Sequence, residues 1–271
     1  MSEKKSRPQH LFEVISTERV SPHVVRVRFG GADIEVIDRP DATDGYFKLL
    51  FADPAHDLTP PYDMDAIAKE LLPVRRTYTV RSWNDDGTIS IDFVTHGEQG
   101  IAAPWAMRAQ PGNLLAATGP GSGYRPGAGT NWHLMVGDDS ALPAISAAVE
   151  SLPQDARGHV IVEVDSAADE IAPVTVPERV HVQWLHRDGA VPGERSLLPD
   201  AVRALEWPAE GVQVFAHGER ESMKTLRQIF FVERKLARDA VSLSGYWAFG
   251  RTEDRFQAEK REPIGQIDPQ N

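Results

Sequence analysis

The stretch GPGSGYRPGAGTN, residues 119–131, divides the chain into two parts with different hydrophobic patterns. Its glycines and prolines are typical of a turn or linker and interrupt any regular element. The 271 residues are enough for two domains of about 100 to 150 residues each. We therefore expect one domain over residues 1–127, with residues 1–9 disordered, and a second over residues 128–271.

The part before this stretch consists of short apolar or alternating runs separated by turn clusters such as NDDG and QPGN. Six closely spaced strands predict a small antiparallel β-barrel. We expect helices only at residues 64–72 and 102–109. The six expected strands are residues 11–20, 24–30, 46–51, 75–83, 88–96 and 113–119.

The part after it alternates apolar strands with helical patterns, which favours a parallel α/β sheet. A helix is expected over residues 140–152, with Ser140 as its N-cap and Pro143 in its first turn. A second helix is expected over residues 221–237. The expected strands are residues 133–140, 159–166, 179–187 and 211–218. The fold class is thus a two-domain β plus α/β protein.

Composition excludes several classes of function. The chain has no cysteine, which rules out disulfides, a cysteine nucleophile and cysteine-ligated clusters. A net charge of −11 disfavours nucleic acid, so an anionic ligand would need a local basic pocket. There is no apolar run of about 18 residues and no signal-peptide pattern, so we expect a cytoplasmic protein with no membrane partner. The nine histidines lack metal-ligand spacing, and no metal site is expected.

The stretch RRTYTVR, residues 75–81, gathers cations in this acidic chain. Strand alternation places Arg76, Tyr78 and Val80 on one face. An arginine beside a tyrosine can hold a pyrophosphate and a flat ring, although an ordinary solvated strand face fits the heptapeptide as well. Arg75 and Arg81 are expected on the other face, where they aid solubility or pair with carboxylates.

Three further motifs leave the chemistry open. VTHGEQGIAAPWA, residues 94–106, reads as a strand, a glycine turn and a helix start, which is either an anion site or a plain turn. VGDDSALPAI, residues 136–145, stands where a G-x-G-x-x-G fingerprint would be and lacks it. SGYWAFGRTEDRFQAEKRE, residues 244–262, carries aromatics that either pack on the second domain or cover a planar cofactor. No G-x-S-x-G elbow is present, which disfavours hydrolysis.

Taken together, RRTYTVR, HGEQGIAAPWA, PGNLLAATGP, VGDDSALPAI and GYWAFGRTEDRFQAEKRE resemble the siderophore-interacting protein family, flavin-dependent ferric-siderophore reductases related to ferredoxin reductases. The resemblance covers residues 10 to 262. It implies that FAD binds the barrel and that NADH or NADPH, or in some members a reduced ferredoxin, supplies electrons to the α/β domain. The implied reaction reduces Fe(III) in a siderophore and releases Fe(II).

The resemblance also assigns roles to individual positions. Arg76 would contact the FAD phosphates, Tyr78 would stack on the flavin ring, and Thr79 and Val80 would lie beside it. The remaining implied FAD residues are His96, Gly97, Gly100, Ala102, Ala103 and Trp247. The implied NAD(P)H residues are Gly137, Asp138, Ser140, Ala141, Asp165 and Gly218. Asp165 could accept from a ribose 2′-OH and would repel a 2′-phosphate, which favours NADH.

Lys48 and Arg251 match basic positions implied to hold the ferric siderophore, and Arg125 matches less well because its loop departs from the family pattern. Many relatives carry arginines where this chain has Ala248 and Phe249, which predicts a less basic pocket and argues against a preference for highly charged catecholate complexes. Two other functions fit the same residues. One is a protein that binds FAD and siderophore with little turnover of its own, and the other is a general flavin oxidoreductase with a different acceptor.

Overall fold

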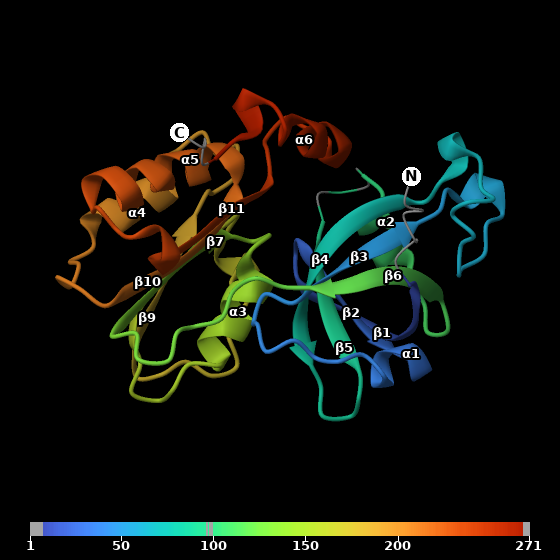
Figure 1. Cartoon of the computed structure of the whole chain (residues 1–271), viewed down its shortest axis with the longest axis horizontal. Coiled ribbons are helices and arrows are strands. Elements are labelled where there is room, and N and C mark those ends of the chain that lie inside the picture. The colour runs from blue at the N-terminus through green and yellow to red at the C-terminus, as the bar shows by residue number, and fades with distance from the viewer. Residues whose placement is uncertain (1–7, 96, 98–99, 268–271) are drawn as a thin grey trace, which may run out of the picture. The chain divides into compact units, whose positions relative to one another are not determined.

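The computed structural model describes residues 8–95, 97 and 100–267. The chain divides into two compact units, and the boundary along the sequence lies between Gly123 and Tyr124 (Figure 1). Within the described residues, no helix has the length and apolar character needed to cross a membrane.

Unit 1, residues 1–123, is a closed antiparallel barrel with strand order β1-β2-β5-β4-β3-β6. Pairing of β6 with β1 closes it. The prediction of a six-stranded barrel is therefore confirmed. The strands are β1 (His10–Ser21), β2 (Val24–Gly30), β3 (Tyr46–Phe51), β4 (Val74–Trp83), β5 (Ile89–Val94) and β6 (Leu114–Gly121).

The barrel core is aromatic and aliphatic. Phe12, Phe29, Phe47 and Phe93 are fully buried inside it. The predicted helix α2 (Ala102–Arg108) packs Trp105 against this core. Burial of side chains that alternate along each strand supplies most of the stabilisation of such a barrel.

The predicted helix at residues 64–72 is wrong. Ala68 has extended backbone, and only a short 3-10 turn, η2 (Lys69–Leu71), follows it. Met64 and Ile67 pack on Tyr62 and its neighbours from a single turn, in which the Ile67 backbone N–H donates to the Asp63 carbonyl at 3.1 Å, and this turn does not continue as a helix. Two further short elements of unit 1 were not predicted, α1 (Ala32–Glu35) and the 3-10 turn η1 (Pro54–His56).

Unit 2, residues 124–271, is built on a five-stranded parallel sheet with order β11-β10-β7-β8-β9. The parallel α/β prediction is confirmed, but the edge strand β11 was missed. The strands are β7 (Trp132–Asp138), β8 (Arg157–Val164), β9 (Arg179–His186), β10 (Val212–Glu219) and β11 (Val241–Trp247). The helices are α3 (Leu142–Glu150), α4 (Leu197–Ala204), α5 (Arg220–Gln228) and α6 (Glu253–Glu259), with short turns η3 (Ala167–Asp169), η4 (Ile229–Glu233), η5 (Arg238–Ala240) and η6 (Pro263–Gly265).

Helices cover both faces of this sheet (Figure 1). Met135 of β7 packs with Ile145 of α3 on one face. Leu134 and Val136 of the same strand pack on the other face, where α4 and α5 lie and Met223 is buried. Burial on both faces explains why these strands are continuously apolar. Because all five strands run parallel, their carboxyl ends lie at a single edge of the sheet, where ligands bind in open α/β sheets.

The predicted helix at residues 221–237 is correct in its first half. α5 begins one residue earlier, at Arg220, and ends at Gln228, after which the chain forms the π-helical turn η4. Glu219 is the N-cap, and its Oε2 accepts from the backbone N–H groups of Glu221 and Ser222.

Candidate functional site

Strand β4 carries the candidate flavin-binding residues of unit 1. Its register with β3 places Arg76 opposite Leu49 and Tyr78 opposite Phe47. Residues directly opposite in an antiparallel pair share a face, so Arg76 and Tyr78 lie on the same side of the strand. Both are half-buried, and the Tyr78 ring lies 4.4 Å from the ring of Phe93.

The first half of β4 has a strand neighbour on one side only among the described residues. Its pairing with β3 runs from Val74 to Thr79, whereas its pairing with β5 begins at Val80. Among the described residues, no strand pairs with the backbone edge from Val74 to Thr79 on the β5 side. Thr79 and Val80, at the end of this edge, are 9% and 2% exposed.

Arg81 was expected either to aid solubility or to pair with carboxylates, and its burial does not fit the first of these roles. Its residue is 5% exposed, whereas Arg75 is exposed as expected. A register shift between Val80 and Ser82 in the β4–β5 pair interrupts the simple alternation at this point. A bulge of this kind redirects a side chain that the sequence pattern alone would place in solvent.

The turn between β5 and α2 contains further predicted residues. Gly97 and Gly100 have φ values of 67° and 81°, and a Cβ atom on either would meet no atom within 4 Å. Backbone conformation, not crowding, therefore favours glycine at both positions. Ala102 and Ala103, in the first turn of α2, are buried. His96 lies outside the described residues.

The basic residues predicted to hold a siderophore lie in three separate segments, one strand and two loops. Lys48 of β3 is half-buried opposite Thr77, so it lies on the other face of the β3–β4 pair from Arg76 and Tyr78. Arg125 is exposed at the start of unit 2, and its carbonyl accepts from Gln213 Nε2 at 3.1 Å. Arg251 follows β11.

In unit 2, several predicted nucleotide-site residues meet around Asp138, at the carboxyl end of β7. Ser140 is not the cap of α3, because the helix begins after Ala141 and no side chain caps it. The Ser140 hydroxyl and backbone N–H both donate to Asp138 Oδ1. Asp138 Oδ2 accepts from the backbone N–H of Glu219 and from the Trp247 indole N–H, each at 2.8 Å.

Asp138 therefore joins the ends of β7, β10 and β11. It is 2% exposed, and burial, then the neighbouring Asp139, raise its pKa to about 6 despite the hydrogen bonds that favour the charged form. Gly218 has a φ of 151°, and a Cβ there would lie 2.7 Å from Asp138 Oδ2. A Cβ on Gly137 would lie 2.5 Å from the His217 carbonyl oxygen. Both glycines permit this close packing.

A buried arginine that sequence reasoning missed lies beside this cluster. Arg187, just beyond β9, contacts Asp139 at 3.0 Å, Glu163 at 3.4 Å and Asp165 at 4.0 Å. Burial is the largest influence on Glu163 and raises its pKa to about 7, although Arg187 opposes that shift. The side chain of Asp165 is 34% exposed. In the sequence, the only sign of this contact is Arg187 itself, which ends the apolar stretch WLHR.

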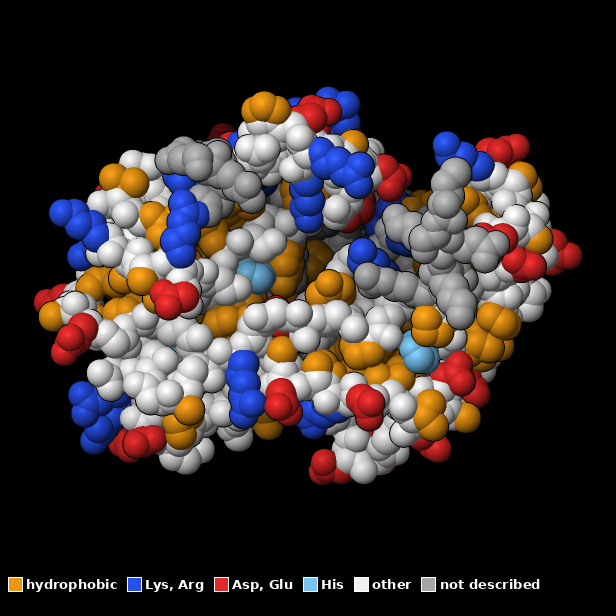
Figure 2. Space-filling view, in the orientation of Figure 1, with side chains coloured by type: hydrophobic (Ala, Val, Ile, Leu, Met, Phe, Trp, Pro, Cys, Tyr) orange, Lys and Arg blue, Asp and Glu red, His pale blue; other side chains and the backbone are white. Residues whose placement is uncertain are grey.

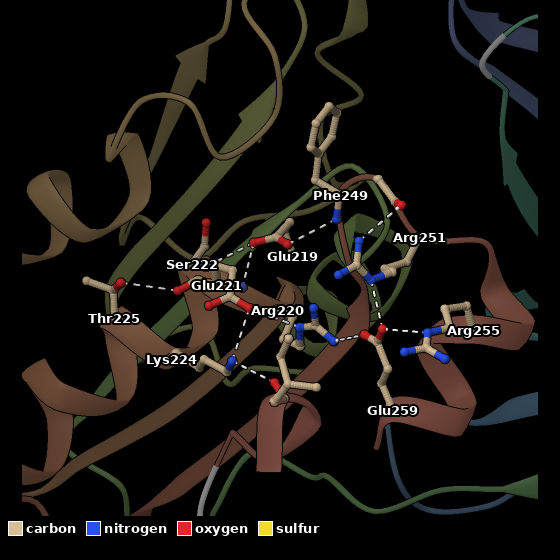
Figure 3. Close-up of polar contacts among 12 residues, drawn as sticks. Glu219, Arg220, Glu221, Ser222, Lys224, Thr225, Phe249, Arg251, Arg255 and Glu259 are labelled. Carbon is tan, nitrogen blue, oxygen red and sulfur yellow. Dashed lines mark hydrogen bonds and ion pairs between the residues drawn. The ribbon is translucent and has the colours of Figure 1, made fainter. Parts of the chain in front are cut away.

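Arg251 belongs to a second polar cluster, drawn in Figure 3. Its Nε donates to Glu259 Oε1 at 2.8 Å, and the same oxygen accepts from Arg255 Nε at 2.8 Å. Glu259 Oε2 accepts from Arg220 Nη1 at 2.6 Å. The hydrogen bond from Arg220, followed by those from Arg255 and Arg251, outweighs burial and lowers the pKa of Glu259 to about 2. Sequence reasoning missed Arg220, Arg255 and Glu259; the i,i+4 spacing of the last two was the available signal.

Comparisons with known proteins agree with this two-unit arrangement. Residues 13–124 match the siderophore-interacting FAD-binding domain family, and residues 130–250 match the siderophore-interacting protein family. An uncharacterised protein of Mycobacterium tuberculosis is 42% identical over 94% of this chain and 96% of its own length. The ferric vibriobactin reductase ViuB of Vibrio cholerae is 34% identical over 92% of this chain and 93% of its own.

Among solved structures, the siderophore-interacting protein SipS of Aeromonas hydrophila superimposes with a TM-score of 0.82 at 27% identity. The superposition covers 96% of this chain and 99% of that protein. The two family matches and the full-length relatives lead to one assignment. This chain belongs to the siderophore-interacting protein family, and its N-terminal unit is a siderophore-interacting FAD-binding domain.

Proposed function

We propose that the protein reduces ferric siderophores, with NAD(P)H as electron donor and FAD as the bound cofactor, and so releases Fe(II). The observation that carries the proposal is the placement of Arg76 and Tyr78 on one face of β4, in the segment for which the described residues show no pairing with β5. It occurs in a chain 34% identical, over nearly its whole length, to a ferric vibriobactin reductase.

The residues present fit FAD. The guanidinium of Arg76 can pair with phosphate oxygens, and the half-buried ring of Tyr78 offers an aromatic surface. Thr79 and Val80 lie at the point on β4 where its pairing with β5 begins. We assign the pyrophosphate and adenine to the segment with His96, Gly97, Gly100, Ala102 and Ala103, and a wall of the flavin site to Trp247.

When bound, FAD supplies a group that accepts a hydride and gives up electrons singly. Two ferric complexes are then reduced for each NAD(P)H oxidised, and one proton is released. Fe(II) is held far more weakly than Fe(III) by oxygen donors, so reduction alone releases the metal. The protein's residues therefore need to bind and orient the reactants, and no acid or nucleophile is required.

We infer that NADH is preferred over NADPH. Asp165 and Asp139 would repel a 2′-phosphate, and Arg187, a buried cation just beyond β9, already contacts both. In this proposal Gly137, Ser140, Ala141 and Gly218 shape the backbone against which the nucleotide binds. Asp138 fixes that backbone through its four accepted hydrogen bonds. A reduced ferredoxin is the alternative donor.

For the ferric siderophore, we propose that Lys48, Arg125 and Arg251 supply positive charge. The chain as a whole carries −11, so an anionic complex depends on such local cations. Figure 2 shows Lys and Arg side chains over the region of α6 on an otherwise mixed surface.

Anaerobic mixing of NADH with the yellow protein tests the proposal against its alternatives. Bleaching of the flavin, followed by Fe(II) only when ferric siderophore is added, supports the reductase. Failure to bleach with NADH or NADPH favours a binding protein or a ferredoxin-fed enzyme. Bleaching with no Fe(II) from any ferric siderophore favours a general flavin oxidoreductase.

A further inference from the structure

Glu259 is a buried carboxylate that accepts hydrogen bonds from three guanidinium groups. Its side chain is 1% exposed, and it contacts Arg220, Arg251 and Arg255 (Figure 3). Arg220, itself buried, also contacts Glu221 at 3.0 Å and so has two carboxylate partners. Arg251 and Arg255 share one oxygen of one carboxylate, so each has only a part of that carboxylate's charge as a partner.

The shared contact leaves donors for a ligand. Arg251 and Arg255 each use Nε to reach Glu259, and Arg251 Nη1 also donates to the Gly250 carbonyl at 3.4 Å. A guanidinium has five N–H donors in one plane, so each group keeps further donors. Their side chains are 36% and 60% exposed. Among the described residues, Arg255 contacts one acidic partner, Glu259. Two planar donor groups are thus held side by side with solvent-facing edges.

The backbone that carries these arginines is also fixed. Glu219 Oε1 accepts from the Phe249 backbone N–H at 3.2 Å, while Oε2 caps α5. The Arg251 backbone N–H donates to the Ala248 carbonyl at 3.1 Å. Thr252 caps α6 through the backbone N–H of Arg255. A ligand therefore meets guanidinium groups that are already oriented, and little conformational entropy is lost on binding.

We propose that Arg255 is an additional substrate-binding residue and that Glu259 is a positioning residue that orients Arg251 and Arg255 toward the anionic oxygen donors of the ferric complex. This inference rests on the proposed function. Two guanidinium groups on one carboxylate oxygen repel each other, and a ligand with several anionic oxygens relieves that repulsion. The favoured ligand class is a polyanionic complex such as a ferric tris(catecholate), in preference to a neutral tris(hydroxamate). This differs from the expectation drawn from Ala248 and Phe249, because Arg255 supplies a cation that the sequence comparison did not include.

Binding of the redox-inert gallium(III) tris(catecholate), followed by tryptophan fluorescence of the full-length protein, tests the inference without turnover. We expect Arg255→Gln to raise Kd roughly tenfold, as the loss of one charge-assisted contact would. Arg255→Lys, which keeps the charge but not the fork, should recover part of the affinity. The matched control is Arg203→Gln, which removes another half-exposed arginine paired with a glutamate, Glu233, and should leave Kd unchanged.

Glu259→Gln tests the positioning role, with Glu233→Gln as its control. Glu259→Gln should raise Kd for the gallium tris(catecholate), and it should raise KM for the ferric counterpart by a larger factor than it raises KM for the neutral acceptor menadione. A thermal melt reports separately on folding. If Arg255→Gln lowers the melting temperature but leaves Kd unchanged, the arginine is only structural and the inference is overturned.

The two proposals fail in different ways. A wild-type protein that binds the gallium complex through Arg255 but reduces no ferric siderophore contradicts the reductase and supports the binding site. A wild-type protein that reduces ferric tris(catecholate), with Kd and KM unaffected by Arg255→Gln, contradicts the binding site and leaves the reductase standing. Absence of gallium-complex binding to the wild type also overturns the inference.

Discussion

Arg75 and Arg76 are neighbours on β4 that carry the same charge on opposite faces of the strand. Arg75 is exposed, whereas Arg76 shares the face of Tyr78. They form a matched pair of variants because each substitution removes one positive charge from the same strand.

Arg76→Ala is expected to weaken FAD binding by roughly 1.5–3 kcal/mol, about tenfold to a hundredfold, because one charged partner of the phosphates is lost. Visible flavin absorption after gel filtration measures it. Arg75→Ala should retain FAD. A purified Arg76→Ala protein that stays as yellow as wild type would count against the assignment.

Gly218 allows Asp138 to reach β10. Gly218→Ala should lower the free energy of unfolding by about 2 kcal/mol or more, because its Cβ would lie 2.7 Å from Asp138 Oδ2 at a φ of 151°. Denaturant unfolding measures it. Gly189→Ala is the control, since that position has a φ of 77° but no atom near the added Cβ, and should cost only about 1 kcal/mol. Equal losses of unfolding free energy in the two variants would contradict the claim that close packing against Asp138 requires glycine at position 218.

At the residue scale, sequence could predict what depends on local pattern. The alternation of β4 placed Arg76 and Tyr78 together, and the register agrees. It could not predict the burial of Arg81, which follows from a bulge against β5. Nor could it predict the contacts of Ser140 with Asp138, or those of Arg187, because each is formed between groups that only the folded sheet brings together.

At the scale of elements, the carboxyl ends of β7, β8 and β9 gather acidic groups around one buried arginine. Glu163 has a pKa of about 7, above its ordinary value of 4.5, chiefly because burial disfavours its charged form. The folded state therefore binds this proton more tightly than the unfolded state. Its effect is that stability decreases as pH rises from about 4.5 to about 7.

Glu163→Gln should remove this pH-dependent contribution to the free energy of unfolding. Stability of the variant relative to wild type should increase between pH 4.5 and 7, by on the order of 2 kcal/mol. Unfolding measured at several pH values tests it. Glu178→Gln, at an exposed position just before β9, should keep the wild-type pH profile. A difference between Glu163→Gln and wild type that does not vary with pH would contradict the assignment.

Element boundaries were predictable where periodicity was strong, as in the barrel strands. The expected helix at residues 64–72 failed because packing on Tyr62 and an extended Ala68 outweighed helix propensity. Strand β11 was missed because its aromatic end also fits a segment that packs on another surface. In the structure, Val241–Trp247 pairs in parallel with β10. Pairing with a distant strand is a tertiary property.

At the scale of the whole molecule, an acidic chain has to bind anionic ligands with a few local cations. The order of a barrel and a parallel sheet followed from the pattern change around residues 119–131. The sequence pattern could not predict which cations gather, because Arg220, Arg251 and Arg255 converge on Glu259 from two separate segments.

Lys48→Ala and Arg251→Ala should each raise KM for ferric siderophore and leave FAD bound. We expect a change on the order of tenfold for Arg251 and a smaller one for Lys48, a point charge without a planar fork. Steady-state kinetics and flavin absorption measure these effects. Lys69→Ala, at an exposed position in η2, is the control. Unchanged KM values in both variants would reject these residues as substrate contacts.

The central claim is that this protein passes electrons from a nicotinamide nucleotide to siderophore-bound iron. The most direct test is anaerobic addition of NADH to the FAD-loaded protein, followed by ferric siderophore and a chromogenic Fe(II) chelator. The account predicts flavin bleaching by NADH, then recovery of the flavin colour with two Fe(II) formed for each NADH consumed. Flavin that bleaches with NADH but forms no Fe(II) with any ferric siderophore would contradict it.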